Sequence, residues 1–127
     1  LAKRRENLLY VLNRFDRFAP YLSTITEESH EQIGPHAIPI IVNEQAKFTS
    51  TELSRFLENN GIETRTLFAS MPTQCPGFRY LGHSLGEFPN AEYVGLNGIH
   101  IGVHQDVGLK EMHYVIDILE RFIISHQ

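Results

Sequence analysis

The sequence predicts an α+β domain in which helices lie on one face of a small, mostly antiparallel sheet. The expected order of elements is helix, strand, helix, strand, long loop, strand, helix, and this alternation is too short for a doubly wound parallel sheet. With 127 residues, 42% of them hydrophobic and 20% charged, the chain is long enough to form one domain with its own apolar core. No disulfide or metal is needed to explain its folding.

The first expected element is a helix over residues 4–21. Apolar side chains recur there at close to helical spacing, and Pro20 ends or bends the helix because proline donates no backbone hydrogen bond. The residues of this apolar stripe are Leu8, Val11, Leu12, Phe15, Phe18 and Leu22. The polar segment 23–35 predicts a loop, and the apolar run 36–43 predicts a strand in which Pro39 indicates an edge position or a bulge.

A second helix and a second strand follow over residues 49–61 and 62–68. Thr49 or Ser50 is typical of a helix N-cap, because its hydroxyl can accept a hydrogen bond from the first turn. Gly61 is typical of the position just after a helix end. The strand that follows alternates between two faces and opens onto a loop.

The C-terminal part combines a long loop, a strand and a helix. The segment 69–98 is rich in proline and glycine and predicts a loop with a short helix near 88–94. The segment 99–104 alternates like a strand. One of its faces holds Ile99, Ile101 and Val103, and the other holds His100, Gly102 and His104. The segment 109–125 predicts a closing helix with a single apolar stripe.

The composition argues against several classes of function. A formal charge of -4 and a pI near 6.0 give no support to a nucleic-acid partner. No apolar run has the length of a membrane span, and the basic start at residues 3–5 is not followed by the apolar region of a signal peptide. The single cysteine, Cys75, excludes an internal disulfide and fits a reducing compartment, so we expect a cytoplasmic protein without a membrane partner.

We expect neither a metal site nor a nucleophile. A metal needs three or four converging ligands, whereas four strand residues separate His100 from His104 by roughly 13 Å. Cys75 lies in no motif with a histidine that would activate it, and a lone cysteine is typical of a small apolar filler. The segment 82–86, GHSLG, imitates a hydrolase elbow, but it lacks the preceding strand and the following helix.

Arg65 is the leading candidate for a binding residue. It lies near the end of an expected strand, where a guanidinium can present two parallel donors to a carboxylate or a phosphate. The alternative is a surface arginine that pairs with Glu63 or with a helix carboxylate. Gln74 in the following loop, and Asn97 and His104 on either side of the last strand, are polar groups that could face the same pocket.

A resemblance to a known family rests on three passages of the sequence. They read FLENNGIETRTLFASMPTQCPGF, FPNAEYVGLNGIHIGVHQDV and KEMHYVIDILERFI. In this order they resemble the C-terminal small domain of the DegT/StrS family, the pyridoxal-phosphate (PLP)-dependent aminotransferases and dehydratases of nucleotide-linked sugars. The resemblance covers nearly the whole chain from the RRENLLYVL segment onward. The form GIETRTLF, followed by a glutamine-bearing loop, is most similar to the branch that includes hexulose 3-dehydrases.

The resemblance implies a domain organisation. Residues 1–22 would be a leading helix from a large domain that this sequence lacks, and residues 23–127 would be the small domain of a fold-type I PLP enzyme. The large domain would supply the cofactor lysine (a histidine in the 3-dehydrases), the aspartate that pairs with the pyridine nitrogen, and the phosphate-binding loop. We therefore expect PLP in the parent protein only, with no catalytic or cofactor-binding residue in this chain.

The resemblance also implies roles for four residues and a set of partners. Arg65 and the loop 70–78, with Gln74, would lie at the mouth of the cofactor cleft. His104 and Asn97 would approach the sugar from the last strand, so all four are expected to bind substrate. The expected partners are a nucleotide-linked sugar, the chain's own large domain and a second copy in a homodimer.

The expected function is to close the substrate cleft of a nucleotide-sugar aminotransferase that aminates a keto-deoxysugar. The alternatives are a nucleotide-hexulose 3-dehydrase of the same family, a free-standing regulatory module that binds a small anion through Arg65, and a structural interaction domain. A start at Leu1, with no methionine and directly in a helical pattern, indicates a longer parent. The fragment alone is expected to be inactive.

Overall fold

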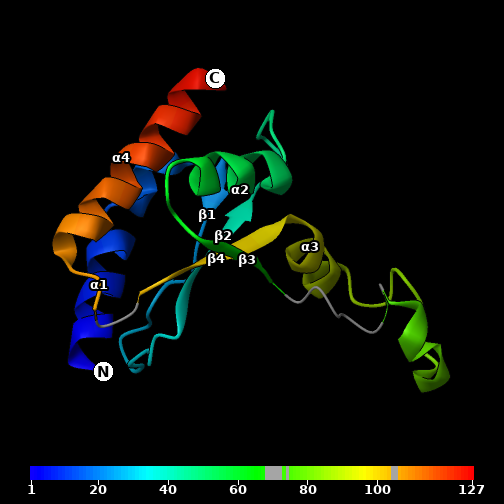
Figure 1. The fold of residues 1–127 in the computed structure, drawn as a ribbon. Helices are drawn as coiled ribbons and strands as arrows, with labels where there is room; N and C mark the ends of the chain where they lie inside the picture. Colours follow the sequence, from blue (N-terminus) through cyan, green and yellow to red (C-terminus); the bar gives the residue numbers. More distant parts are fainter. Residues whose placement is uncertain (68–72, 74, 104–105) are drawn as a thin grey trace.

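The computed structural model describes residues 1–67, 73, 75–103 and 106–127. Within these residues it contains a four-stranded antiparallel sheet with the strand order β1-β2-β4-β3 (Figure 1). The strands are β1 (Leu22–Ser23), β2 (Ala37–Val42), β3 (Thr64–Thr66) and β4 (Gly98–Gly102). The helices are α1 (Ala2–Leu12), α2 (Ser50–Asn59), α3 (Pro89–Asn97) and α4 (Leu109–Ser125), with the 3₁₀ helices η1 (Phe15–Phe18) and η3 (Pro76–Leu81). The predicted α+β architecture is confirmed.

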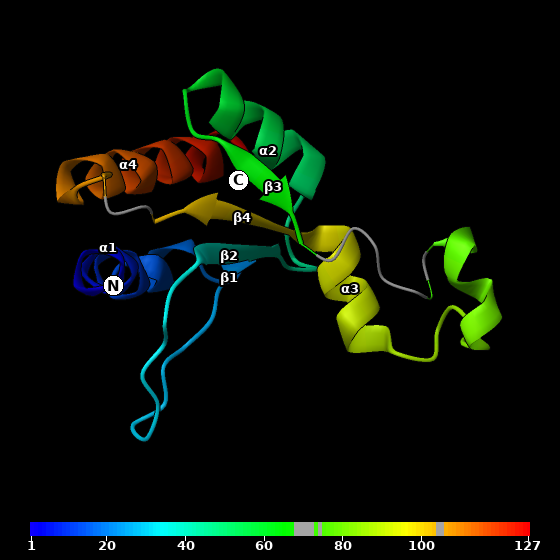
Figure 2. The ribbon, with the colours of Figure 1, turned by 60° about the horizontal axis from the view of Figure 1, so that its bottom comes forward.

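One face of the sheet carries the apolar core. Side chains alternate along each strand, so Ile38 and Ile40 of β2 point to the same face as their partners Ile101 and Ile99 of β4. All four are at most 3% exposed. Helices α1, α2 and α4 pack on this face, and α1 and α4 lie side by side (Figures 1 and 2). Each aliphatic side chain buried in this way contributes roughly 1.5–3 kcal/mol.

Helix α4 forms the longest side of this core and follows the predicted stripe. Its buried residues are Met112, Val115, Ile116, Ile118, Leu119, Phe122 and Ile123. Their spacing of three and four residues places them on one side of the helix. Among the described residues, neither α4 nor any other helix combines the length and the apolar character that crossing a membrane requires.

The N-terminal helix is shorter than predicted. Helix α1 ends at Leu12 instead of near Tyr21, and η1 follows it. The reason is the spacing of Phe15 and Phe18, because side chains three residues apart lie above one another in a 3₁₀ turn. Both rings are buried and meet edge to face, with 5.1 Å between their centroids. The chain can then turn at Tyr21 into β1 and pair with β2.

Pro39 lies in an inner strand, so the prediction of an edge strand was wrong. Strand β2 pairs with β1 on one side and with β4 on the other, and its register with β4 runs without a bulge. The missing N–H is tolerated because the short β1 ladder has already ended at Ile41. On that side the Pro39 carbonyl accepts a hydrogen bond from the Thr24 hydroxyl at 2.6 Å. Pro39 therefore occupies a local end of the ladder.

The second helix begins and ends as predicted. The Thr49 hydroxyl caps α2 by accepting a hydrogen bond from the Glu52 backbone N–H at 3.1 Å. Gly61 follows the helix with a φ of 82°, in the left-handed region that favours glycine. Strand β3 is shorter than expected and forms the edge beside β4. Helix α3 covers the short helix expected near 88–94 and extends to Asn97.

The segment 75–88 projects from the body of the domain (Figures 1 and 2). It contains η3, which was not predicted within the expected loop, and Tyr80 is 79% exposed. The base of the segment is fixed by the buried carboxylate of Glu92. This group accepts backbone hydrogen bonds from Gly86 at 2.7 Å and from Phe88 at 2.8 Å. The projection is therefore anchored to the start of α3.

Candidate functional site

The face of the sheet opposite the core carries a row of basic side chains. His100 of β4 pairs with Pro39 of β2 on one side and with Arg65 of β3 on the other. Paired residues of an antiparallel ladder place their side chains on the same face, so His100 and Arg65 are neighbours there. His36 precedes β2, and its ring centroid lies 6.3 Å from that of His100. His36, His100 and Arg65 together are called the basic row.

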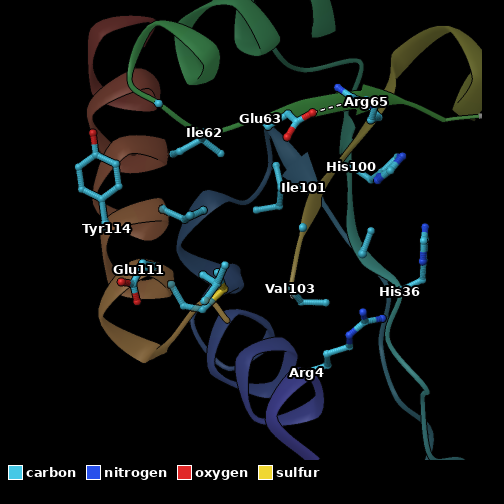
Figure 3. Close-up of a pocket in the computed structure, with 16 residues that line it drawn as sticks. Arg4, His36, Ile62, Glu63, Arg65, His100, Ile101, Val103, Glu111 and Tyr114 are labelled. Carbon is cyan, nitrogen blue, oxygen red and sulfur yellow. Dashed lines mark ion pairs between the residues drawn. The ribbon is translucent and has the colours of Figure 1, made fainter. Parts of the chain in front are cut away.

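The basic row borders a groove of about 540 Å³ between the sheet, α1 and α4 (Figure 3). The groove extends from the basic row to the core side of the sheet, where its apolar floor consists of buried core side chains that include Ile62, Ile101, Val103 and Met112. In Figure 3 the basic row lies on the sheet side, while Tyr114 and Glu111 of α4 lie opposite. Arg4 of α1 also lines the groove, next to the start of β2. A concave apolar floor with a few charged groups at its rim is the usual form of a small-molecule site.

Arg65 forms an ion pair with Glu63 and donates a hydrogen bond to the Thr64 carbonyl at 3.1 Å. The ion pair is the surface pairing that the sequence left open as the alternative to anion binding. The two charged side chains are 65% and 72% exposed, so their pairing contributes little to stability. A phosphate that accepts two parallel hydrogen bonds from the guanidinium can compete with Glu63. Substrate binding by Arg65 stays a prediction.

The electrostatics of the basic row favour an incoming anion. Burial lowers the pKa of His100 below its ordinary value of 6.5, and the positive charges of His36 and Arg65 lower it further. The protonated ring is therefore disfavoured in the empty groove. A negative charge placed between these side chains would reverse this preference, because it would attract all three of them.

The structure describes only two of the four residues expected to bind substrate. Asn97 lies at the end of α3, outside the groove lining, and donates its side-chain amide to the Tyr93 carbonyl at 3.1 Å. Gln74 and His104 lie outside the described residues. The substrate roles of Asn97, Gln74 and His104 therefore stay predictions.

Sequence analysis did not identify His36 and His100 as binding residues. The alternation of residues 99–104 placed His100 on the polar face of its strand, which was a usable signal. The strand order was not available, and it alone brings His100 beside Arg65. His36 precedes its strand, where alternation says nothing about the direction of a side chain.

The described residues do not fit PLP chemistry. That cofactor requires a lysine, or a residue that replaces it, and a partner for the pyridine nitrogen. The chain has three lysines, Lys3, Lys47 and Lys110; all are exposed and none lines the groove. Among the described residues, no three histidine, cysteine or acidic side chains gather closely enough to bind a metal ion.

The sequence of the chain matches a protein-family model over residues 1–120. This family is described as the DegT/DnrJ/EryC1/StrS aminotransferase family. The chain belongs to this family. Its members include PLP-dependent sugar aminotransferases and 3-dehydratases, as the relatives below illustrate. The family likeness stated from the sequence is thus confirmed.

Individual relatives carry names from both branches. The chain is 27% identical over 96 residues to dTDP-4-dehydro-2,6-dideoxy-D-glucose 3-dehydratase of Saccharopolyspora spinosa, covering 70% of this chain and 21% of that protein. It is similar to GDP-4-keto-6-deoxymannose-3-dehydratase with a trapped PLP-glutamate geminal diamine, at 25% identity and a TM-score of 0.75, covering 93% of this chain and 30% of that one. A Streptococcus pneumoniae protein described as a sugar aminotransferase, in its PLP form, gives 16% identity and a TM-score of 0.77, covering 100% of this chain and 32% of that one.

These likenesses differ in what they show. The Streptococcus pneumoniae match, at 16% identity, shows the shared fold alone. In every case the chain spans about a third or less of the length of its relative. The chain therefore corresponds to one part of these proteins, and the fold-type I small-domain architecture expected from the sequence is confirmed.

Proposed function

We propose that this chain is the C-terminal domain of a PLP-dependent enzyme of nucleotide-sugar metabolism, and that it covers the substrate in the cleft of a cofactor domain. The observation that carries this proposal is the groove beside β3 and β4, where Arg65 and His100 border an apolar floor. Such a surface suits a ligand with phosphate groups and a less polar remainder. The family membership of the chain and the substrates in its relatives' names support this substrate class.

The proposed organisation has residues 1–22 leading out of a large PLP-binding domain and residues 23–127 forming the covering domain. Helix α1 packs against α4, and Leu8 and Val11 of α1 are fully buried. The leading helix is thus part of the core of the covering domain. A movement of this domain relative to the cofactor domain would carry α1 with it as one rigid unit.

In this proposal the chain's own residues bind and enclose the substrate. Arg65 would donate two parallel hydrogen bonds to a phosphate or carboxylate at the mouth of the cleft, where Gln74 would also bind the substrate, while Asn97 and His104 would contact the sugar. Enclosure would fix the orientation of the substrate, an effect that can contribute several powers of ten in rate. The bond-breaking chemistry would belong to residues outside this chain.

Of the two reactions in the family, we favour removal of a sugar hydroxyl, as in a nucleotide-hexulose 3-dehydratase. The relatives reported at 25% identity or more carry 3-dehydratase names, whereas the aminotransferase likeness lies at 16%. This order reverses the expectation from the sequence, in which aminotransferase came first. Amination of a keto-deoxysugar remains the second candidate, because the shared fold fits both reactions.

The test is the visible absorption spectrum of the intact protein that carries this chain, recorded before and after treatment with borohydride. In a 3-dehydratase with histidine at the lysine position, bound cofactor is expected to wash away after reduction. A yellow band that reduction fixes to the protein would indicate a cofactor lysine and favour amination. An intact protein no larger than 14.6 kDa and without bound PLP would overturn the proposal and favour the free-standing anion-binding module.

The projecting segment is the surface that we propose to contact a partner. Exposed apolar side chains gather on the projecting segment, at Tyr80, Leu81, Leu85 and Phe88. Clustered apolar groups of this kind usually mark a contact surface, which supports a neighbouring large domain or the second copy of a homodimer.

A single cysteine fits a reducing compartment, so we propose a cytoplasmic enzyme.

A further inference from the structure

Three positively charged or protonatable groups gather on the sheet side of the groove from three separate parts of the chain. Arg65 comes from β3, His100 from β4 and His36 from the residue before β2. The two rings, 6.3 Å apart between centroids, are too close to be protonated together without mutual repulsion. A negative charge between the two rings would relieve this repulsion.

With neutral histidines, the formal charges of the two arginines and the two carboxylates that line the groove cancel. Among the residues that the structure describes, the charged or titratable groups that line the groove with His100 are His36, Arg65 and Glu63 from the sheet side, Arg4 from α1, and Glu111 and Tyr114 from α4. Glu63 is paired with Arg65, and Glu111 accepts a hydrogen bond from the Gly108 backbone N–H at 2.9 Å at the start of its own helix. The two carboxylates are thus engaged away from the imidazoles.

The shape of the row favours an extended anion over a compact one. Neighbouring strands lie roughly 4.8 Å apart, and Figure 3 shows Arg65 and His36 at opposite ends of a line with His100 between them. A single phosphate can approach two neighbours in such a line, whereas two linked phosphates can engage all three.

From this geometry we propose that His36 and His100, together with Arg65, form a proton-dependent binding site for the diphosphate group of an esterified ligand. This inference rests on the proposed function and deepens it. His100 would add its positive charge only when the ligand is present, so the ligand would bind together with a proton. Affinity would then rise as the pH falls through the range in which His100 titrates.

The sign of this effect follows from the direction of the pKa change. In the free chain the pKa of His100 is lowered by burial, by His36 and by Arg65, so the ring is neutral near pH 7. A bound dianion stabilises the protonated ring and raises its pKa. By linkage, the affinity for the ligand rises as the pH falls. In the pH range between the pKa of the free form and that of the bound form, it rises about tenfold per pH unit for each proton taken up.

The experiment uses the intact protein that carries this chain, histidine-resolved NMR and UDP-glucose as the probe. Its doubly esterified diphosphate keeps a constant charge between about pH 5 and pH 8, so any pH dependence of binding belongs to the protein. We expect the pKa of His100 to rise on binding, and the affinity to increase at least about tenfold from pH 8 to pH 6. The ring of His113, hydrogen-bonded to the Tyr10 hydroxyl at 3.0 Å, reports that the fold is intact.

Matched variants separate the roles of the three residues. His100→Gln should flatten the pH dependence and His36→Gln should weaken binding, whereas His30→Gln, on the exposed segment before β2, should change neither. Arg65→Gln should weaken binding at every pH because its charge does not titrate, and Arg79→Gln in the projecting segment serves as its control. Inorganic phosphate tests for a compact anion and should bind more weakly than UDP-glucose.

Three outcomes would contradict the proposed site: one concerns the histidines, one the diphosphate and one the site as a whole. Binding of UDP-glucose with the same affinity at pH 6 and pH 8 would remove the histidines from the site and leave Arg65 as the anion ligand of the proposed function. Inorganic phosphate binding as tightly as UDP-glucose would overturn the assignment to a diphosphate. No binding of either probe at pH 6 would overturn the whole site, while the cofactor spectrum of the intact protein would still decide the proposed function.

Discussion

At Gly98 the chain passes from α3 directly into β4. A Cβ atom at this position would lie 2.6 Å from the Val94 carbonyl oxygen and 2.8 Å from a methyl group of Leu67. The first neighbour is helix backbone and cannot move aside without disturbing α3. A glycine is therefore required by close approach, although its φ of -106° is open to any residue.

This contact predicts the cost of a single methyl group. Gly98→Ala should lower the free energy of unfolding by about 1–3 kcal/mol, because the overpacked methyl forces α3 and β4 apart. Gly102→Ala, on the same strand and the same face, meets nothing within 4 Å and should change it by less than about 0.5 kcal/mol. Urea unfolding followed by circular dichroism measures both variants. Equal stabilities would contradict the close approach at Gly98.

A second prediction concerns Glu27 in the segment that leads to β2. Its carboxylate accepts hydrogen bonds from the Arg5 guanidinium and, at 2.7 Å, from the Ile33 backbone N–H. Arg5 first, and then the Ile33 N–H, lower the pKa of Glu27 from 4.5 to about 2. Because the folded-state pKa is lowered, the stability that this group contributes is present above pH 4.5 and is lost as the pH falls toward 2.

The comparison that checks this is the pH dependence of unfolding in Glu27→Gln. The variant should lose the part of the acid destabilisation that falls between about pH 4.5 and pH 2, because it has no carboxylate to protonate. Glu28→Gln, one residue away and exposed, is the matched control and should keep the wild-type profile. Identical profiles for Glu27→Gln and the wild type would contradict the lowered pKa.

At the scale of elements, helix α2 has the start, the end and the buried side that its local sequence predicts. Its cap at Thr49, its stop at Gly61 and its buried Leu53 and Leu57 are all readable from the sequence. Helix α1 shows the opposite, because its helical spacing continues past the point where the chain turns. Core packing of Phe15 and Phe18 overrides the local pattern there.

Removal of the α2 cap gives the prediction at this scale. Thr49→Ala should lower the free energy of unfolding by about 0.5–2 kcal/mol, because the Glu52 N–H loses its acceptor in the first turn. Thr51→Ala, within the same turn and exposed, removes a hydroxyl without removing the cap. Chemical denaturation of both variants separates the two effects. A loss for Thr51→Ala as large as that for Thr49→Ala would mean that the cap is not responsible.

At the scale of the whole molecule, two segments leave the compact body (Figure 2). The segment 24–36 is fastened to α1 through Glu27 and Arg5, and the segment 75–88 is fastened to α3 through Glu92. The first ends at His36, beside the groove. The second carries the exposed apolar side chains that we assign to contact with another domain or copy.

The prediction for the whole enzyme concerns Arg65. In the intact protein that carries this chain, Arg65→Gln should raise KM for the nucleotide sugar roughly 10- to 100-fold, because a charged hydrogen bond to the substrate is lost. The kcat value should change much less, since the bond-breaking residues would lie elsewhere. Arg55→Gln on the exposed side of α2 is the control and should leave both constants unchanged. A loss confined to kcat would contradict a binding role.

The sequence by itself determined the α+β class, the cap and stop of α2, the stripe of α4 and the family, because these depend on local spacing and on short motifs in a fixed order. Tertiary structure alone decided that Pro39 lies in an inner strand, since that depends on where the two-residue β1 ends. It also decided that His36 and His100 stand beside Arg65. Strand order and register join residues far apart in the chain, and the alternation within one strand contains no information about its neighbours.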